Sequence, residues 1–384
     1  MSPLPGEDTR PGLFGPNAVA ELPAMAESLG LKRMLLLTGR ASFAASGAAR
    51  VLPRLREVGD VETWSDFAPN PRVEDVVAGA QVVRSFEPDS ILAIGGGSVL
   101  DMAKLLCVLG DLDEADIPDA IRANAIGPRT RTLILAPTTS GSGSEATHFA
   151  VAYIGSEKYS VAGQELLPDA VVLDPTLTAS ASPYQKATSV IDAIAQAVES
   201  AWARGATEQS RSFAHQALAD LMPSALGYVR SGTPEATLAA RGSYLAGRAI
   251  DLSKTTGAHA MAYALTSRHG VSHGHAVATT LGAFARLHAR DAQTLPHQAR
   301  LRHDLDEIAG LIGVHAADQI GDRLDAFAAE LGLELRLETL GVAHTELPLL
   351  VGAVNLERLA NNPTAVTEAE LIELLEGCYR SSSV

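Results

Sequence analysis

Two histidines, His259 and His273, begin and end the stretch HAMAYALTSRHGVSH, which is too polar for plain core and too apolar for a surface loop. Histidine serves proteins both as a metal ligand and as a general acid or base near neutral pH. On one straight helix the two side chains could not face each other, whereas a helix that ends and turns could bring them together. The stretch therefore predicts a turn between helices, with a shared ligand as one role for the pair.

Two loops rich in glycine and hydroxyl residues each follow an apolar run of β type. AIGGGSVLDMAK (93–104) leads into a helical pattern, and PTTSGSGSEAT (137–147) repeats the arrangement. Glycines let backbone N–H groups approach an anion at a helix N-terminus, and open α/β sheets bind ligands at their carboxyl edge. The pair indicates a dinucleotide pyrophosphate site. The first loop alone also fits a ligand-free turn, because its spacing is neither GxGxxG nor a P-loop.

The elements that must hold these loops divide the chain into two parts. Four apolar runs are typical of parallel strands covered on both faces: MLLLTG (34–39), SILAIGGG (90–97), TLILAPTT (132–139) and AVVLDP (170–175). The later spacing favours helices over 185–203, 207–230, 234–252, 298–331 and 367–377, the last opened by a capping-box pair, Thr367 and Glu370. We predict an α/β Rossmann-like domain over residues 1–180 and an all-α domain over residues 181–384.

Composition limits the partners. The 384 residues leave room for two domains, and 45 acidic against 30 basic side chains give a net charge of −15, which opposes binding to nucleic acid or anionic lipid. The chain has 2 cysteines, no secretory signal pattern and no apolar run near the roughly 18 residues of a membrane span. We expect a cytoplasmic protein that acts on a small molecule.

With VIDAIAQAVES (190–200), these motifs follow the order found in the iron-containing, or group III, alcohol dehydrogenases, and the chain resembles that family over nearly its whole length. WSDFAPNPRVEDV (64–76), KYSVAGQELLPDAVVLDP (158–175) and KTTGAHAMAYALTSRHGVSHGHAVA (254–278) are most similar to its phosphonoacetaldehyde-reducing branch. The resemblance implies the architecture shared with dehydroquinate synthase: a nicotinamide-binding domain, a helical domain and a divalent metal in the cleft between them. A homodimer is expected by resemblance alone.

The resemblance also assigns cofactor contacts. The matching positions are Gly95, Gly96, Gly97, Ser98, Asp101, Thr138, Thr139, Ser142 and Lys158. Gly39 stands where NAD-preferring relatives often carry an aspartate, whose charge would repel the 2′-phosphate of NADP. Arg40 and Ser42 could hold that phosphate, which favours NADPH with NADH tolerated, unless Arg40 is an ordinary solvated loop residue.

Metal-binding members use an aspartate, a histidine four residues later, and two histidines fourteen residues apart. The matching residues here are Asp192, Gln196, His259 and His273. Residues four apart share one helical face, so Asp192 and Gln196 can reach a common point. An amide oxygen suits Fe²⁺ or Zn²⁺ less well than imidazole, so metal binding is expected to be weakened, altered or lost. The alternative to a metal site is that Asp192 caps a helix or forms an ion pair and that the two histidines are core residues.

The same segment offers a proton donor and cations. Tyr263 stands where many members have a further histidine, and a phenol can donate a proton, although its ordinary pKa near 10 makes it a weak acid. His269 and His275 are alternative acids. Lys254 and Arg268 could bind a phosphonate, unless both form surface salt bridges.

The leading hypothesis is NAD(P)H-dependent reduction of phosphonoacetaldehyde to 2-hydroxyethylphosphonate. The main alternative is a group III dehydrogenase for a small uncharged aldehyde or alcohol. A lyase related to dehydroquinate synthase would need a glutamate ligand and more cations around its substrate, and neither is clear here. A non-catalytic protein would bind NADPH without turning over an aldehyde. Residues after about 285 carry no assignable motif and are predicted to be scaffold.

Overall fold

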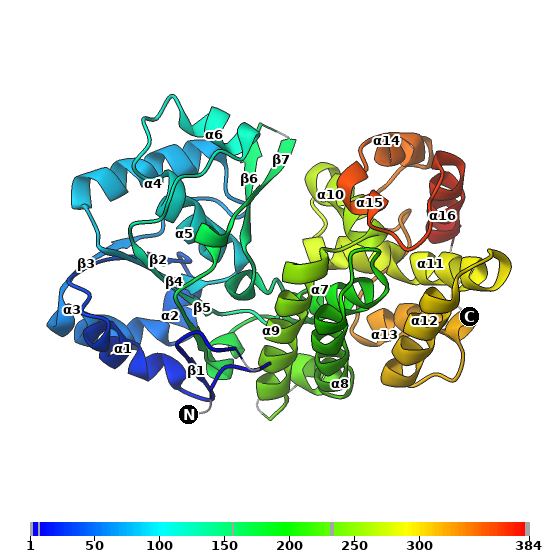
Figure 1. The fold of residues 1–384 in the computed structure, drawn as a ribbon, viewed down its shortest axis with the longest axis horizontal. Coiled ribbons are helices and arrows are strands. Elements are labelled where there is room, and N and C mark those ends of the chain that lie inside the picture. The colour runs from blue at the N-terminus through cyan, green and yellow to red at the C-terminus, as the bar shows by residue number, and fades with distance from the viewer. Residues whose placement is uncertain (1–2, 7, 156, 231–233, 381–384) are drawn as a thin grey trace. The chain divides into compact units, whose positions relative to one another are not determined.

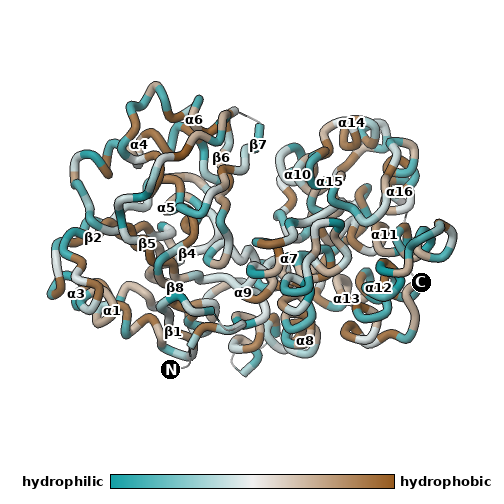
Figure 2. Tube along the Cα trace, in the orientation of Figure 1, coloured by the Kyte–Doolittle hydropathy of each residue, from teal (hydrophilic) through white to brown (hydrophobic). Residues whose placement is uncertain are grey.

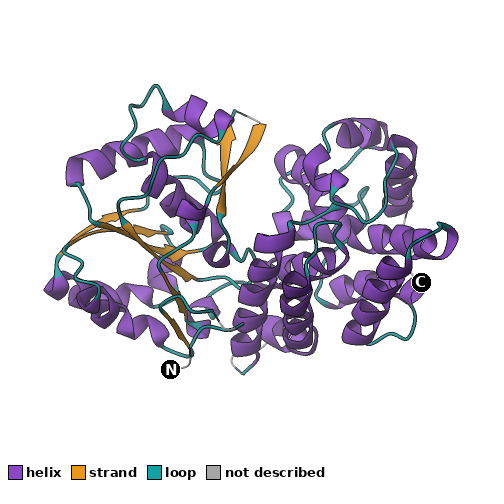
Figure 3. Ribbon diagram, viewed as in Figure 1, coloured by secondary structure: helices purple, strands orange, loops and turns teal. Residues whose placement is uncertain are grey.

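The computed structural model describes residues 3–6, 8–155, 157–230 and 234–380. These form two compact units, Met1–Ala181 and Ser182–Val384 (Figure 1). The sequence predicted a division after residue 180. The α/β character of the first part and the helical character of the second are confirmed, and the described strands all lie in the first unit (Figure 3).

A parallel sheet of six strands forms the centre of the first unit, in the order β1-β8-β5-β4-β2-β3. The four predicted runs all became strands of this sheet. Its strands are β1 (Gly12–Phe14), β2 (Arg33–Thr38), β3 (Asp60–Trp64), β4 (Ser90–Gly95), β5 (Thr132–Pro137) and β8 (Ala170–Leu173). An antiparallel hairpin, β6 (Phe149–Ile154) with β7 (Glu157–Ala162), stands apart from it.

Helices cover both faces of this sheet because successive strand residues point to opposite sides. Leu35 and Leu37 of β2 pack into one hydrophobic cluster with α4 and α5, whereas Met34 and Leu36 pack into the other with α1 and α3. This explains why the central strands β2, β4, β5 and β8 are almost entirely apolar. The helices of the unit are α1 (Leu22–Ser28), α2 (Ser42–Ala45), α3 (Leu52–Val58), α4 (Val73–Phe86), α5 (Gly97–Leu109) and α6 (Ile117–Ala123).

The strand order contains a switch point. After β2 the chain adds β3 on one side, and β4, β5 and β8 then extend the sheet on the other. Ligands of open α/β sheets bind at the carboxyl ends of the strands where the order reverses. In this unit those ends are the residues after β2 and β4, Gly39 and the turn at 95–98.

Four strands were not predicted from the sequence. The edge strand β1 has only 3 residues, and β3, DVETW, is mostly polar because it borders solvent. The strand β7, EKYSVA, mixes polar and apolar residues without a clear alternation. Its partner β6, FAVAYI, is a continuous apolar run, so a signal for this strand was present in the sequence and was not used.

The second unit contains helices only, among the residues described. They are α7 (Pro183–Trp202), α8 (Glu208–Arg230), α9 (Glu235–Ser253), α10 (Gly257–His269), α11 (His273–Thr294), α12 (Ala299–Ile312), α13 (Ile320–Glu330), α14 (Leu347–Gly352), α15 (Leu356–Ala360) and α16 (Glu368–Arg380). The helix predicted over 298–331 is wrong as one element, because α12 ends before Gly313, which has φ 83°. The predicted capping pair of Thr367 and Glu370 is confirmed at α16.

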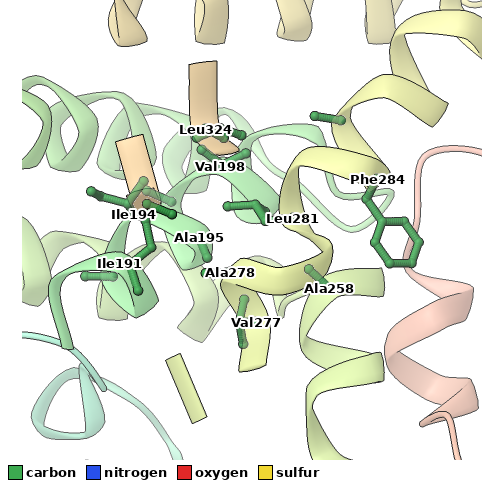
Figure 4. Close-up of a cluster of buried hydrophobic side chains, with 14 of the residues drawn as sticks. Ile191, Ile194, Ala195, Val198, Ala258, Val277, Ala278, Leu281, Phe284 and Leu324 are labelled. Carbon is green, nitrogen blue, oxygen red and sulfur yellow. The ribbon is translucent and has the colours of Figure 1, made fainter. Parts of the chain in front are cut away.

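The core of the second unit gathers around α7, whose first turn carries a capping box between Ser182 and Gln185. Figure 4 shows Ile194 and Val198 of α7 close to Leu281 of α11, with Leu324 of α13 beside them. In the helices α8 and α12, hydrophobic and hydrophilic residues alternate along the chain (Figure 2), as expected where one face of a helix packs inward. Among the described helices, none is long and apolar enough to cross a membrane.

Candidate active site

The two predicted loops of the first unit lie side by side. Gly95 and Pro137 pair at the ends of β4 and β5, and the N–H of Thr138 donates to the Gly95 carbonyl at 2.9 Å. A Cβ on Gly97 would lie 2.9 Å from Ser142 Oγ, so only glycine permits this contact without a shift. Because α5 starts at Gly97, its N-terminal N–H groups lie at this edge, where they suit an anion.

A third segment joins these loops. The N–H of Asn70 donates to Ser98 Oγ at 3.0 Å, and Asn70 has a positive φ of 61°. Asn70 was not among the residues predicted for the site. The turn-forming residues around it, APNPR, were the available signal.

Buried charges fix the second loop. Asp101 accepts hydrogen bonds from Ser144 Oγ at 2.5 Å and from the Val151 N–H at 3.1 Å, so its carboxylate ties α5 to residues 144–151. Lys104, which is fully buried, donates to the carbonyls of Thr147 and Phe149 at 2.8 and 2.9 Å. Burial raises the pKa of Asp101 despite the opposing effect of Lys104. The Asp101 carboxylate therefore supports the loop, and its direct contact with a cofactor stays a prediction.

The residues proposed to select the cofactor follow β2. Arg40 donates to the Ser65 carbonyl at 3.1 Å and forms an ion pair with Asp66, both partners being largely exposed. Exposed ion pairs contribute little, about 0–1 kcal/mol, so this pair could open for a phosphate. Ser42 begins α2 and lies against Gly39. Thr139 lies next to Gly96, and Lys158 sits on β7 opposite Tyr153.

In the second unit, the predicted metal ligands Asp192, His259 and His273 come together, and Gln196 contacts Asp192. One donor atom each from Asp192, His259 and His273 lies within 4.8 Å of the others. Asp192 belongs to α7, His259 to α10, and His273 is the first residue of α11. The ring centroids of the histidines are 5.5 Å apart. A helix that ends and turns does bring them together.

Two glycines make this meeting possible. Gly270, with φ 67°, ends α10 and turns the chain toward α11. A Cβ on Gly274 would lie 2.0 Å from the Thr188 carbonyl oxygen and 2.8 Å from Asp192 Cβ. Because Gly274 has no side chain, the first turn of α11 can touch α7 and set His273 beside Asp192.

The donor set fits a divalent cation. His259 Nε2 is buried and lies 3.3 Å from Asp192 Oδ1, and within the described chain it makes no hydrogen bond of good geometry. Gln196 Nε2 donates to Asp192 Oδ2 at 3.2 Å, so its amide orients the carboxylate. A buried carboxylate with two imidazoles is a usual ligand set for Zn²⁺ or Fe²⁺.

A second buried carboxylate, Glu199, contacts His259. Glu199 is 0% exposed, and its Oε2 receives a hydrogen bond from His259 Nδ1. Burial raises the pKa of Glu199, but His259 and the hydrogen-bond donors outweigh it and hold the pKa below its usual range. Burial lowers the pKa of His259, but Glu199 and Asp192 outweigh this and raise it to about 10. The surplus of negative charge favours a bound cation.

Glu199 was not predicted as a site residue, although its spacing from Asp192 is visible in the sequence. Asp192, Gln196 and Glu199 stand at i, i+4 and i+7 on α7, which is one helical face. Asn361 and Asn362 were also missed, in the part predicted to be scaffold. Asn361 Nδ2 donates to the carbonyls of Ser253 and Thr255, and Asn362 Oδ1 accepts from the Gly257 N–H. They hold the segment that enters α10.

Of the three candidate acids, one lies at the metal-ligand cluster. Tyr263 is one turn after His259 and stacks on the ring of His273. His269 is ten residues beyond His259, about 15 Å along the helix, with Nε2 3.8 Å from Glu346 Oε1. His275 bonds through Nδ1 to the Tyr184 hydroxyl at 3.0 Å and through Nε2 to the Glu334 carbonyl at 2.6 Å. Both ring nitrogens of His275 are therefore engaged structurally.

The predicted phosphonate pair does not form one site. Lys254 precedes α10 and Arg268 lies near its last residue, so a helix of 13 residues, about 20 Å long, separates them. Lys254 forms an exposed ion pair with Glu357, and Arg268 is exposed. A single phosphonate cannot span that length, so at most one of the two cations can bind it.

Comparisons with known proteins cover both units. The family model "Iron-containing alcohol dehydrogenase" matches residues 11–175, and "Fe-containing alcohol dehydrogenase family, C-terminal" matches residues 186–379. Long-chain-alcohol dehydrogenase 1 of Geobacillus thermodenitrificans is 30% identical over 381 residues, covering 96% of this chain and 95% of the relative.

Two further relatives act on aldehydes, by their names. Phosphonoacetaldehyde reductase of Streptomyces viridochromogenes is 32% identical over 343 residues, covering 85% of each chain. The crystal structure of sulfoacetaldehyde reductase from Bifidobacterium kashiwanohense in complex with NAD⁺ is similar with a TM-score of 0.89, at 26% identity and full coverage of both chains.

Proposed function

Because the chain belongs to the iron-containing alcohol dehydrogenase family and is an oxidoreductase, we propose that it reduces phosphonoacetaldehyde to 2-hydroxyethylphosphonate with NADPH or NADH. The substrate class is carried by one observation. Two relatives that cover most of the chain are named for two-carbon aldehydes with an anionic group, one a phosphonate and the other a sulfonate.

The chain's residues have separate roles in this proposal. When bound, the reduced nicotinamide would supply a hydride to the carbonyl carbon, and a divalent cation would supply Lewis acidity for the negative charge that develops on oxygen. Asp192, His259 and His273 would hold the cation, and Gln196 orients Asp192. Tyr263, one turn from His259, is the candidate proton donor to the product oxygen.

The first unit would bind the cofactor at the switch point of its sheet. The N–H groups at the start of α5 and the hydroxyls of Thr138, Thr139 and Ser142 would face the pyrophosphate. Gly39 presents no carboxylate to a 2′-phosphate. Arg40 can release its exposed partner Asp66 and bind that phosphate instead. These features support a preference for NADPH.

Lys254 is the better of the two cation candidates for the phosphonate. Arg268 is nine residues after His259, about 13 Å along α10, which exceeds the few ångströms between the phosphorus and the carbonyl of the substrate. Lys254 has a strained backbone, with φ 61°, and an exposed partner, Glu357, that it could release.

The test compares phosphonoacetaldehyde with acetaldehyde and propionaldehyde by following oxidation of NADPH and of NADH. We expect a much higher kcat/KM for the phosphonate, and Lys254→Gln should reduce only that rate, with Arg268→Gln as a matched control. Equal kcat/KM for all three aldehydes would reject the substrate assignment.

A dehydrogenase for uncharged alcohols is the second candidate. It is favoured by the relative named for long-chain alcohols, which matches 96% of the chain. The same assay with a series of primary alcohols and NAD⁺ or NADP⁺ separates the two, because activity that rises with chain length supports this candidate alone.

A further inference from the structure

Glu199 divides its two carboxylate oxygens between two tasks. Oε1 accepts hydrogen bonds from the N–H groups of Thr256 at 3.1 Å and Ala258 at 3.0 Å, and from Thr256 Oγ1 at 2.8 Å. It thereby satisfies donors at the start of α10, which would otherwise be buried without partners. Oε2 is left for His259 Nδ1.

Because Oε1 is occupied by these donors, His259 contacts Oε2, and this contact fixes which nitrogen of His259 bears a proton. The carboxylate can only accept, so His259 must donate through Nδ1. Once a metal displaces the other proton, Nε2 is the nitrogen with a free lone pair, and it is also the nitrogen that lies 3.3 Å from Asp192 Oδ1.

We propose that Glu199 is a positioning residue that holds His259 in the Nδ1–H tautomer and aims its Nε2 at the cation. This inference rests on the metal site of the proposed function and on no assumption about the substrate. Hydrogen-bond partners of this kind orient metal-bound histidines in other proteins, and their loss costs about 10–100-fold in metal affinity.

The isosteric change Glu199→Gln separates orientation from packing. An amide has one acceptor oxygen, and the donors of Thr256 and Ala258 require it at the Oε1 position. The NH₂ group must then face His259 Nδ1, which has to accept, so the proton moves to Nε2 and blocks the cation. The reverse amide orientation would set NH₂ against the backbone donors.

The experiment measures binding of Zn²⁺ and of Co²⁺ alone to the full chain, by competition with a chelator, for wild type, Glu199→Gln and a control. Asp291→Asn is the control, because Asp291 is another buried acid of the same unit, bonded to Thr364 and distant in sequence from the ligands. We expect about 10–100-fold weaker binding for Glu199→Gln only. Affinity within twofold of wild type, or an equal loss in the control, would overturn the proposal.

A second measurement needs no stable variant. In zinc-loaded wild type with ¹⁵N-labelled histidine, His259 should show a protonated Nδ1 and a metal-bound Nε2, assigned by comparison with His259→Asn. Coordination through Nδ1 would overturn the proposal even if Glu199→Gln fails to fold. Neither measurement uses an aldehyde, so a wrong substrate assignment leaves both readouts intact.

Discussion

The ring of Tyr263 stacks on that of His273, with centroids 5.8 Å apart and planes inclined by 11°. The phenol therefore lies beside a predicted metal ligand, at the position where many family members carry a histidine. Phenylalanine would keep the stacking and lose the hydroxyl. We expect Tyr263→Phe to lower kcat about 100-fold, the size of a lost general acid, without changing Zn²⁺ affinity. Steady-state kinetics and metal titration check this, and full activity would remove Tyr263 from proton transfer.

Substitution of Gln196 by histidine is expected to strengthen metal binding. Its amide donates to Asp192, whereas an imidazole at this position could ligate the cation directly. We expect Gln196→His to tighten Zn²⁺ binding by about one order of magnitude. Chelator competition measures the change. Unaltered affinity would mean that residue 196 does not reach the cation.

Substitution of Gly274 tests whether the close contact of α11 with α7 is needed to assemble the site. A methyl group there would collide with the Thr188 carbonyl oxygen at 2.0 Å, which is backbone and cannot move alone. We expect Gly274→Ala to destabilise the protein by about 1–3 kcal/mol and to weaken metal binding, as α11 shifts from α7. Gly310 of α12 is the control, since a Cβ there meets nothing within 4 Å, and Gly310→Ala should stabilise by about 0.5–1 kcal/mol. Denaturant unfolding gives both values.

Arg40 bears on the choice of cofactor. A lost charged hydrogen bond to the 2′-phosphate costs about 1.5–3 kcal/mol, so Arg40→Ala should raise KM for NADPH about 10–100-fold. KM for NADH should stay the same, because NADH lacks that phosphate. Equal effects on both cofactors would assign Arg40 a structural role in the loop.

Glu145 makes stability depend on pH. Burial raises the pKa of this carboxyl from 4.5 to about 7, against the opposing effect of Lys104. The folded protein thus keeps a proton that the unfolded chain releases, and stability is lost as pH rises from about 4.5 to about 7. Glu145→Gln should remove up to about 3 kcal/mol of this decline. Urea unfolding near pH 5 and near pH 8 measures the slope, and an unchanged slope would contradict the assignment.

Elements with a strong hydrophobic pattern could be predicted from the sequence. The runs at β2, β4, β5 and β8 are almost entirely apolar because both faces are covered, and the family motifs picked out Asp192, His259 and His273, whose donor atoms lie within 4.8 Å of one another. The short strand β1 and the polar strand β3 lack such a pattern. The contact of Asn361 with Ser253 joins residues 108 positions apart through ordinary loop chemistry, which no local signal reveals.

The structure separates the two predicted phosphonate-binding cations for a geometric reason. Lys254 and Arg268 flank the histidine segment in sequence, and flanking residues of a loop can meet. Here the segment is mostly one rigid helix, so the same flanking residues are held apart by its length. Sequence proximity carried no information about distance until the helix was known.

The pairing of β1 with β8 imposes an order on how the first unit is completed during synthesis. Gly12 pairs with Val171, roughly 160 residues later, so at about 5–20 residues per second the first strand waits about ten to thirty seconds for its partner to emerge from the ribosome. Contacts this distant in sequence also form slowly in free refolding. The β1 edge of the sheet therefore closes last, and until β8 emerges the free edge of β5 is open to chaperones or other nascent chains.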